Sequence, residues 1–107
     1  MKPAIWLGDS RKVVKAFPDD ARHRAGAELF RVQKGGEPSN FKPMAGIGPG
    51  VYEIRIVMKT HYRVIYLASR PEGIYVLHAF KKDSARGIKT PHREILTARE
   101  RLRNIGK

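Results

Sequence analysis

The chain has 107 residues, the length of one ordinary domain, and 41% of these residues are hydrophobic while 30% are charged. That composition is typical of a folded globular protein and excludes a disordered chain. The 22 Lys and Arg residues outnumber the 10 Asp and Glu residues, which gives a formal net charge of +12. A protein this basic usually binds a polyanion, so nucleic acid is the first expectation, with an acidic membrane surface or an acidic protein as alternatives.

The chain has no cysteine, so disulfides and thiolate metal sites are excluded and a reducing, cytoplasmic compartment is expected. No apolar run approaches the roughly 18 residues that a membrane-spanning helix needs. The apolar stretch near the N-terminus is too short for a secretory signal. We therefore predict a single domain over residues 1–107 and no membrane partner.

Residues 4–8 form a short apolar run that ends at a glycine, which predicts a first strand. Asp9 and Ser10 are suited to cap a short helix over residues 11–17. Pro18 then interrupts the helical pattern. The inward-facing residues predicted for this short helix are Val13, Val14 and Phe17.

A longer helix is predicted from about Asp19 to Lys34, because apolar residues recur there at the spacing of one helix face. Acidic residues at its start and two glycines at its end favour these limits. The short and the long helix are expected to form an antiparallel hairpin. The inward-facing residues of the long helix are Ala21, Ala25, Leu29 and Val32.

Residues 35–50 are rich in Gly and Pro and are predicted to form a loop, with a short edge strand near residues 41–44. Three longer strands are predicted after it, at about residues 51–59, 62–68 and 74–82. The turns between them are short, so consecutive strands are expected to pair as an antiparallel meander.

After a polar loop over residues 83–89, Thr90 is suited to be the N-cap of a last helix and Pro91 its first residue. That helix is predicted to run to about Asn104. Its apolar side carries Ile95, Ala98, Leu102 and Ile105, and its other side carries Arg93, Arg99, Arg101 and Arg103. The predicted fold class is therefore α+β, a small antiparallel sheet of about four strands with the helix hairpin and the last helix on one face.

Alternation along the strands places several cations on one face of the predicted sheet. Arg55 and Lys59 share a face of their strand with Glu53. A strand arginine between apolar neighbours, such as Arg63, needs a counter-charge, which either Glu53 or a bound phosphate supplies. If the next hairpin pairs Arg63 with His78, a set of five polar groups converges, namely Arg55, Lys59, Arg63, His78 and Lys81 or Lys82.

The last strand is predicted to alternate without interruption. One face then carries Ile74, Val76, His78 and Phe80, and the other carries Tyr75, Leu77, Ala79 and Lys81. Phe80 precedes two lysines, so it is interpreted either as a core residue or as a platform on which a nucleic-acid base stacks.

The segments YEIR, YRVIY, HAFKK and KTPHREI, followed by spaced arginines, resemble the RelE superfamily of ribosome-dependent mRNA endonuclease toxins. The branch that the chain resembles is the phage-derived Gp49-like, HigB-type group. The resemblance extends from the FKPM stretch to the last helix, and the early helix hairpin fits it as well. The chain departs from the family at Tyr52, where tryptophan is frequent, and in a longer segment between Lys82 and Lys89.

The resemblance implies the toxin of a type II toxin–antitoxin pair, which enters the ribosomal A site, beside the 16S rRNA, and cuts the mRNA there. It also implies a cognate helix-turn-helix antitoxin as a partner. The implied reaction needs no metal or other cofactor, because the ribose 2′ oxygen attacks the adjacent phosphorus and the 5′ oxygen leaves. Such a step requires a base, an acid and cations that stabilise the charged phosphorane.

Arg63 is the first candidate for holding the phosphate and Arg55 the second, because a guanidinium binds two phosphate oxygens at once. Proton transfer falls to lysine or histidine, with His92 as one candidate base. The predicted catalytic residues are Arg63, Arg55, Lys81, Lys82 and His78. The predicted RNA-binding residues are Lys59, Phe80, Lys42, Lys89, His92 and Arg93.

Three other functions remain open. One is a non-catalytic RNA- or ribosome-binding module, or an inactive toxin homologue that its antitoxin holds. Another is a DNA-binding regulator, although no helix-turn-helix is recognisable in the sequence. A third is a protein that binds an acidic partner. The four histidines and the acidic residues lack metal-ligand spacing, so no metal site is predicted.

Overall fold

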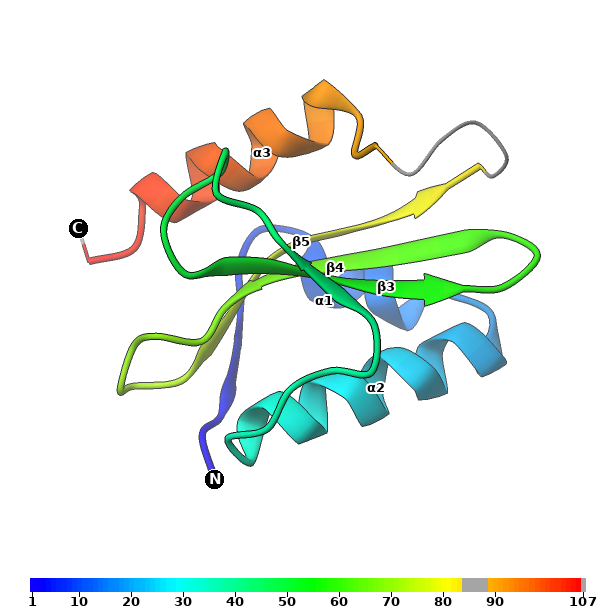
Figure 1. Ribbon diagram of the computed structural model, residues 1–107, viewed down its shortest axis with the longest axis horizontal. Coiled ribbons are helices and arrows are strands. Elements are labelled where there is room, and N and C mark those ends of the chain that lie inside the picture. The colour runs from blue at the N-terminus through cyan, green and yellow to red at the C-terminus, as the bar shows by residue number, and fades with distance from the viewer. Residues whose placement is uncertain (84–88, 107) are drawn as a thin grey trace.

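The structure, a computed structural model, describes residues 1–83 and 89–106 (Figure 1). Within these ranges the chain forms three helices and a five-stranded sheet in the order β1-β5-β4-β3-β2, so the predicted α+β class is confirmed. Most of the predicted polar loop, at 84–88, lies outside the described residues. The elements are β1 (Ala4–Trp6), α1 (Ser10–Lys15), α2 (Asp19–Gln33), β2 (Phe41–Pro43), β3 (Val51–Val57), β4 (His61–Leu67), β5 (Ile74–Lys82) and α3 (His92–Arg103).

The sheet is mixed, whereas the sequence predicted it to be antiparallel with about four strands. β2, β3, β4 and β5 pair antiparallel with their neighbours, but β1 runs parallel to β5, with Ala4 opposite Ile74. Parallel neighbours need a long connection, and here residues 7–73 lie between the two strands. Neither strand therefore carries a local signal for their relative direction.

The helices cover both faces of the sheet, and the prediction that they share one face is wrong. α1 and α2 lie on one side and α3 lies on the other (Figure 1). β4 explains why two layers are needed, because all its residues except His61 are buried. A strand that is buried on both sides requires cover on both sides. The core under α3 is formed by Ile47, Val51, Ile65, Leu67, Leu77, Phe80 and Ala98.

α2 follows its predicted pattern closely. The predicted inward-facing residues, Ala21, Ala25, Leu29 and Val32, are all buried against the sheet. Gly35 directly follows the helical turns and has a φ of +91°, a backbone conformation that favours glycine, so the helix ends there as expected. No helix among the described residues is long and apolar enough to cross a membrane.

A β-bulge in β5 decides which side chains face α3. The ladder between β4 and β5 shifts at Leu77, an additional residue between the paired residues Val76 and His78. Val76 packs under α1 and α2, but His78 and Phe80 both lie on the α3 side. The prediction that His78 and Phe80 share a face with Val76 is therefore wrong, since a bulge reverses the alternation after it.

The register also differs from the pairing that the sequence suggested. Arg63 lies opposite Phe80, and His78 lies opposite Ile65, two residues along the same face. On its other side Arg63 lies directly opposite Arg55 of β3. Two like charges at opposed positions of an antiparallel pair repel each other, so this register requires an acid nearby.

α3 begins without the predicted cap. Pro91 occupies the N-cap position, and the Thr90 hydroxyl forms no hydrogen bond to the helix backbone. The predicted apolar side is correct, because Ala98 is buried and Ile95 and Leu102 pack beside it. Thr90 donates instead to a carboxylate of the sheet, Glu53.

Candidate functional site

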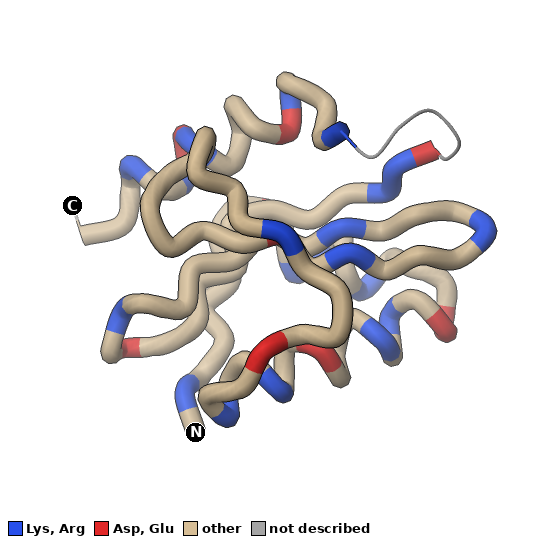
Figure 2. Tube along the Cα trace, viewed as in Figure 1, with Lys and Arg blue, Asp and Glu red and all other residues tan. Residues whose placement is uncertain are grey.

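Basic residues occur at one end of the sheet, where β3, β4 and β5 approach the beginning of α3 (Figure 2). Alternation along the strands places one cation from each of four strands on the α3 face. We call the region around them the basic end of the sheet. Its strand cations are Lys42, Arg55, Arg63 and Lys82.

Glu53 lies among these cations and has no exposed surface. Its Oε1 accepts a hydrogen bond from Arg55 Nε at 3.0 Å and lies 3.5 Å from Arg63 Nη1. Its Oε2 accepts a hydrogen bond from the Thr90 hydroxyl at 2.8 Å. A buried carboxylate is stable only when it is paired, so this one acid offsets the repulsion between the two opposed arginines.

Arg63 is 2% exposed, which places most of its guanidinium out of contact with water. Burial lowers the pKa of Arg63; Glu53 opposes this and Arg55 adds to it. Arg63 Nη1 donates to the Thr90 hydroxyl at 3.2 Å, but Nε has no hydrogen-bond partner among the described residues. An unpaired buried donor costs about 1–3 kcal/mol, so this nitrogen is a place where an acceptor oxygen would be stabilised.

A hollow of about 120 Å³ opens beside the two arginines. Its lining includes Asn40, Arg55, His61 and Arg63. A second hollow, of about 310 Å³, adjoins it and also contains Arg55 and Asn40. Arg55 lines both hollows, and its side chain is 13% exposed against 2% for Arg63, so Arg55 is the more accessible of these two arginines.

His61 is a candidate that the sequence interpretation placed in a turn and did not assign to the site. It begins β4, two residues before Arg63, and therefore lies on the same face of that strand. It pairs with Lys82 of β5, so an imidazole and an ammonium side chain are cross-strand neighbours. Counting the alternation back from Arg63 would have identified it.

His78 belongs to a second polar network, under α3. Its Nε2 lies 2.8 Å from Glu94 Oε1, and its Nδ1 lies 3.1 Å from Arg101 Nη1. A guanidinium can only donate, so Nδ1 accepts and Nε2 carries the proton that it donates to Glu94. The ring also stacks on Phe80, with centroids 5.5 Å apart, which leaves both side chains mostly buried.

Arg101 connects this network to the first turn of the chain, although the sequence predicted that it lies on the outer side of α3. Its Nη1 donates to the Leu77 carbonyl at 3.0 Å, and its Nη2 donates to Asp9 Oδ1 at 2.8 Å. This hydrogen bond and the nearby positive charge hold the pKa of Asp9 below its usual value. Asp9 therefore binds α3 instead of capping α1 with its side chain.

Gly8 makes room for this contact, so replacing it with alanine is expected to lower the free energy of unfolding by about 1–3 kcal/mol. Its φ is +54°, and a Cβ there would overlap the Arg101 guanidinium. Urea denaturation measures the change. The control is Gly26→Ala on α2, where a Cβ meets nothing within 4 Å and a small stabilisation is expected. Equal effects of both substitutions would contradict this role of Gly8.

Two of the predicted convergent lysines lie elsewhere. Lys59 follows the end of β3 and lines a hollow with Pro18 and Asp19, at the start of α2. The side chain of Lys81 is 59% exposed and lines a groove with Phe17 under α1. Both are therefore on the α1–α2 side of the sheet, because strand alternation turns Lys81 away from Lys82 and β3 ends before Lys59.

Four of the remaining predicted RNA-binding residues form an exposed rim, and the fifth, Phe80, is buried. Lys42 lies on the edge strand β2 opposite Glu53, and it is exposed. Lys89 precedes α3, and His92 and Arg93 begin it, all of them exposed. Phe80 is 6% exposed and packs in the core under α3, so its ring is covered in this structure.

The arrangement can bind and position a phosphate group. Arg55 and Arg63 supply guanidinium donors at the hollow, His61 supplies a nitrogen that can exchange a proton, and Lys82 adds positive charge. Lys82 itself is only 8% exposed, so its positive charge acts on the phosphate from a buried position. Among residues 1–83 and 89–106, no three His, Asp or Glu side chains are grouped as metal ligands would be.

Residues 12–103 match the family described as "Phage derived protein Gp49-like (DUF891)". The matched range extends from α1 to the end of α3 and contains the basic end of the sheet and the His78 network. This match confirms the Gp49-like resemblance that the sequence motifs indicated. Neither a curated protein nor a solved structure matches the chain.

Proposed function

The chain belongs to the Gp49-like family of phage-derived proteins, and on that premise we propose that it is the toxin of a type II toxin–antitoxin pair that cuts mRNA on the ribosome. Its partners are then the mRNA in the ribosomal A site, beside the 16S rRNA, and a helix-turn-helix antitoxin. Its place of action is the cytoplasm. The net charge of +12 supports a polyanionic target of this kind.

The observation that carries the proposal is the hollow that Arg55, His61 and Arg63 share at the basic end of the sheet. Two guanidinium groups and an imidazole can supply the cations and the base that metal-independent phosphodiester cleavage needs. Exposed cations on β2 and at the start of α3 surround this end, and they offer contacts to the rest of the RNA backbone. Lys42, Lys89 and Arg93 are assigned this role.

In the proposed reaction, His61 removes the proton from the ribose 2′ hydroxyl, whose oxygen then forms a bond to the adjacent phosphorus. The bond from phosphorus to the 5′ oxygen breaks, and that oxygen takes a proton from solvent. Arg55 holds the phosphate oxygens, because it lines both hollows and is more exposed than Arg63. Arg63 supports Arg55 from its buried position. Arg55 is therefore the first candidate for holding the phosphate and Arg63 the second, the reverse of what the sequence suggested.

A non-catalytic RNA-binding module is the second candidate, and the burial of the predicted catalytic groups favours it. Arg63 is held by Glu53 and Thr90, and His78 is held by Glu94 and Arg101. Groups whose charges and hydrogen bonds are paired within the protein stabilise the fold whether or not RNA is cut. In such a module each surface cation would contribute additively to binding and to its salt dependence.

The proposal is tested by mapping mRNA 5′ ends on ribosomes stalled with a defined codon in the A site. The wild-type protein is expected to produce new ends at that codon, and Arg55→Ala is expected to reduce them by about two or three orders of magnitude. The matched control is Lys81→Ala, which removes one positive charge from the opposite face and should leave cleavage within about threefold.

Samples without ribosomes show whether cutting depends on them. Cleavage that Arg55→Ala and Lys81→Ala reduce equally would contradict the assigned site. No cleavage by the wild type, together with salt-sensitive binding to ribosomes, would replace the nuclease by the binding module.

A further inference from the structure

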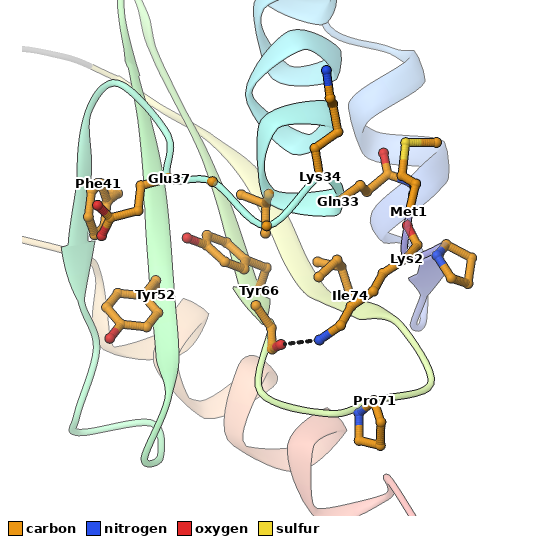
Figure 3. Close-up of a pocket in the computed structure, with 15 residues that line it drawn as sticks. Met1, Lys2, Gln33, Lys34, Glu37, Phe41, Tyr52, Tyr66, Pro71 and Ile74 are labelled. Atoms are coloured by element: carbon orange, nitrogen blue, oxygen red, sulfur yellow. Dashed lines mark hydrogen bonds between the residues drawn. The ribbon is translucent and has the colours of Figure 1, made fainter.

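A hollow of about 870 Å³ opens on the α1–α2 side of the sheet, beside the C-terminal end of α2 (Figure 3). We call it the aromatic hollow. Its volume is within the range of about 300–1,000 Å³ that is typical of small-molecule sites. It shares no lining residue with the two hollows at Arg55, so the proposed RNA chemistry does not account for it.

Three aromatic rings from adjacent strands lie along one side of the aromatic hollow. Phe41 of β2 meets Tyr52 of β3 edge to face, with ring centroids 5.7 Å apart. Tyr52 in turn stacks with Tyr66 of β4 at 6.0 Å. Figure 3 shows all three rings together at the hollow. The face of an aromatic ring carries negative potential, so a row of such rings attracts organic cations.

Negative groups lie beside these rings. Glu37 lines the hollow and makes no hydrogen bond or ion pair with the described residues. Burial, then the neighbouring Tyr52, Glu37 and Glu28, raise the pKa of Tyr66 to about 12. The C-terminal end of α2, which carries the negative end of the helix dipole, also borders the hollow.

The ammonium group of Lys2, which also lines the hollow, is already paired with backbone carbonyls. Lys2 Nζ donates to the Ala68 carbonyl and to the Arg70 carbonyl, both at 3.0 Å, and Figure 3 marks the first of these bonds. The other lysine of the lining, Lys34, points away along α2, and its ammonium lies 5.3 Å from the ring centroid of Phe30. No lysine of the lining therefore neutralises Glu37 or covers the rings.

We propose that the aromatic hollow is a binding site for an organic cation, an ammonium or guanidinium group on an apolar stem. The partly exposed rings of Phe41 and Tyr52 receive the cation, the buried ring of Tyr66 packs beside Tyr52, and Glu37 supplies the opposite charge. Such a site is unexpected in a protein with a net charge of +12, because the overall field repels cations. The aromatic rings, the Glu37 carboxylate and the C-terminal end of α2 oppose that positive field within the aromatic hollow.

The first test is an NMR titration of the ¹⁵N-labelled protein with choline and with its uncharged isostere 3,3-dimethylbutan-1-ol. Choline is expected to shift the amide signals of Gly35, Glu37, Tyr52 and Tyr66 in a saturable way, while the isostere shifts them much less. Equal shifts with both probes would overturn the proposal, because they would show an apolar groove without preference for charge. No saturable shift with choline, spermidine or acetyl-arginine-amide would also overturn it.

Two further probes distinguish the source of the cation. Stronger binding of spermidine would indicate a free polyamine, and stronger binding of acetyl-arginine-amide would indicate a basic side chain of a peptide. Glu37→Gln is expected to weaken the binding of either probe by about tenfold. The control Glu100→Gln removes an exposed carboxylate from α3 and should leave the Kd unchanged. Equal Kd values for both variants would contradict the role of Glu37.

These titrations contain neither ribosomes nor RNA, and the proposal does not rest on RNA cleavage. A protein that fails to cut mRNA but binds choline at the aromatic hollow would separate the two conclusions. A protein that cuts mRNA but gives no saturable shift with any cation would overturn only the cation site.

Discussion

Replacing Glu53 by glutamine is expected to lower the free energy of unfolding by about 3–5 kcal/mol, the largest effect of any single substitution proposed for this protein. The reason is that Arg63 stays buried when its counter-charge is removed, and an amide offers it no negative charge. Domains of this size are stable by only about 5–15 kcal/mol in total. The variant should therefore be close to unfolded at moderate urea concentrations.

Urea denaturation followed by circular dichroism measures this change, with Glu100→Gln on the exposed side of α3 as the control. That control should change the free energy of unfolding by less than about 0.5 kcal/mol. A second variant keeps the explanation testable: Glu53→Leu combined with Arg63→Met should recover much of the loss, because it removes both buried charges. A loss below about 1 kcal/mol for Glu53→Gln alone would show that solvent reaches these arginines.

Replacing His61 by glutamine is expected to slow mRNA cleavage on the ribosome by about 10²–10⁴-fold, the range observed for loss of a general base. Glutamine keeps a polar side chain of similar length but cannot accept the 2′ proton. His61 begins β4 and is partly exposed, so the substitution should leave the fold and ribosome binding nearly unchanged. The expected signature is therefore a loss of rate without a loss of affinity.

Single-turnover cleavage of an mRNA with a defined A-site codon measures the rate, and ribosome co-sedimentation measures the affinity. The matched control is His23→Gln, because His23 is exposed on α2 on the other side of the sheet. That variant should cut at the wild-type rate. If His61→Gln cuts within about threefold of the wild type while Arg55→Ala is inactive, the hollow is the site but another group is the base.

Several tertiary contacts explain why the site could be predicted only in part. Arg55 and Arg63 could be assigned to one region because a two-residue period is a local property of each strand. Which of them reaches the surface depends on Glu53 and Thr90, and Thr90 is 37 positions away from Glu53 in the chain. Thr90 therefore looked like a helix cap, since the local signal for a cap does not include a distant carboxylate.

His78 is a second residue whose position the sequence could not predict. One additional residue at Leu77 turns His78 to the side of the sheet opposite Val76, and no feature of the segment from 74 to 82 predicts that bulge. The ring then finds Glu94 and Arg101 on α3. Arg63 and His78 share the α3 face, but Arg63 lies opposite Phe80, so the suggested pairing of Arg63 with His78 is wrong. Of the two lysines predicted as alternatives, Lys82 lies on that face and the exposed Lys81 lies on the other.

The amino-acid sequence alone determined the positions of the helices and the longer strands, the buried side of α2, the family and the basic character of the protein. These properties follow from periodicity, composition and short motifs, which act over a few residues. Only the tertiary structure decided the direction of β1, the opposite placement of α3, the bulge at Leu77 and the link from Arg101 to Asp9. Those features depend on contacts between residues that are distant in the chain; Arg101 and Asp9, for example, are 92 positions apart. Such contacts contribute their energy only when the chain is folded.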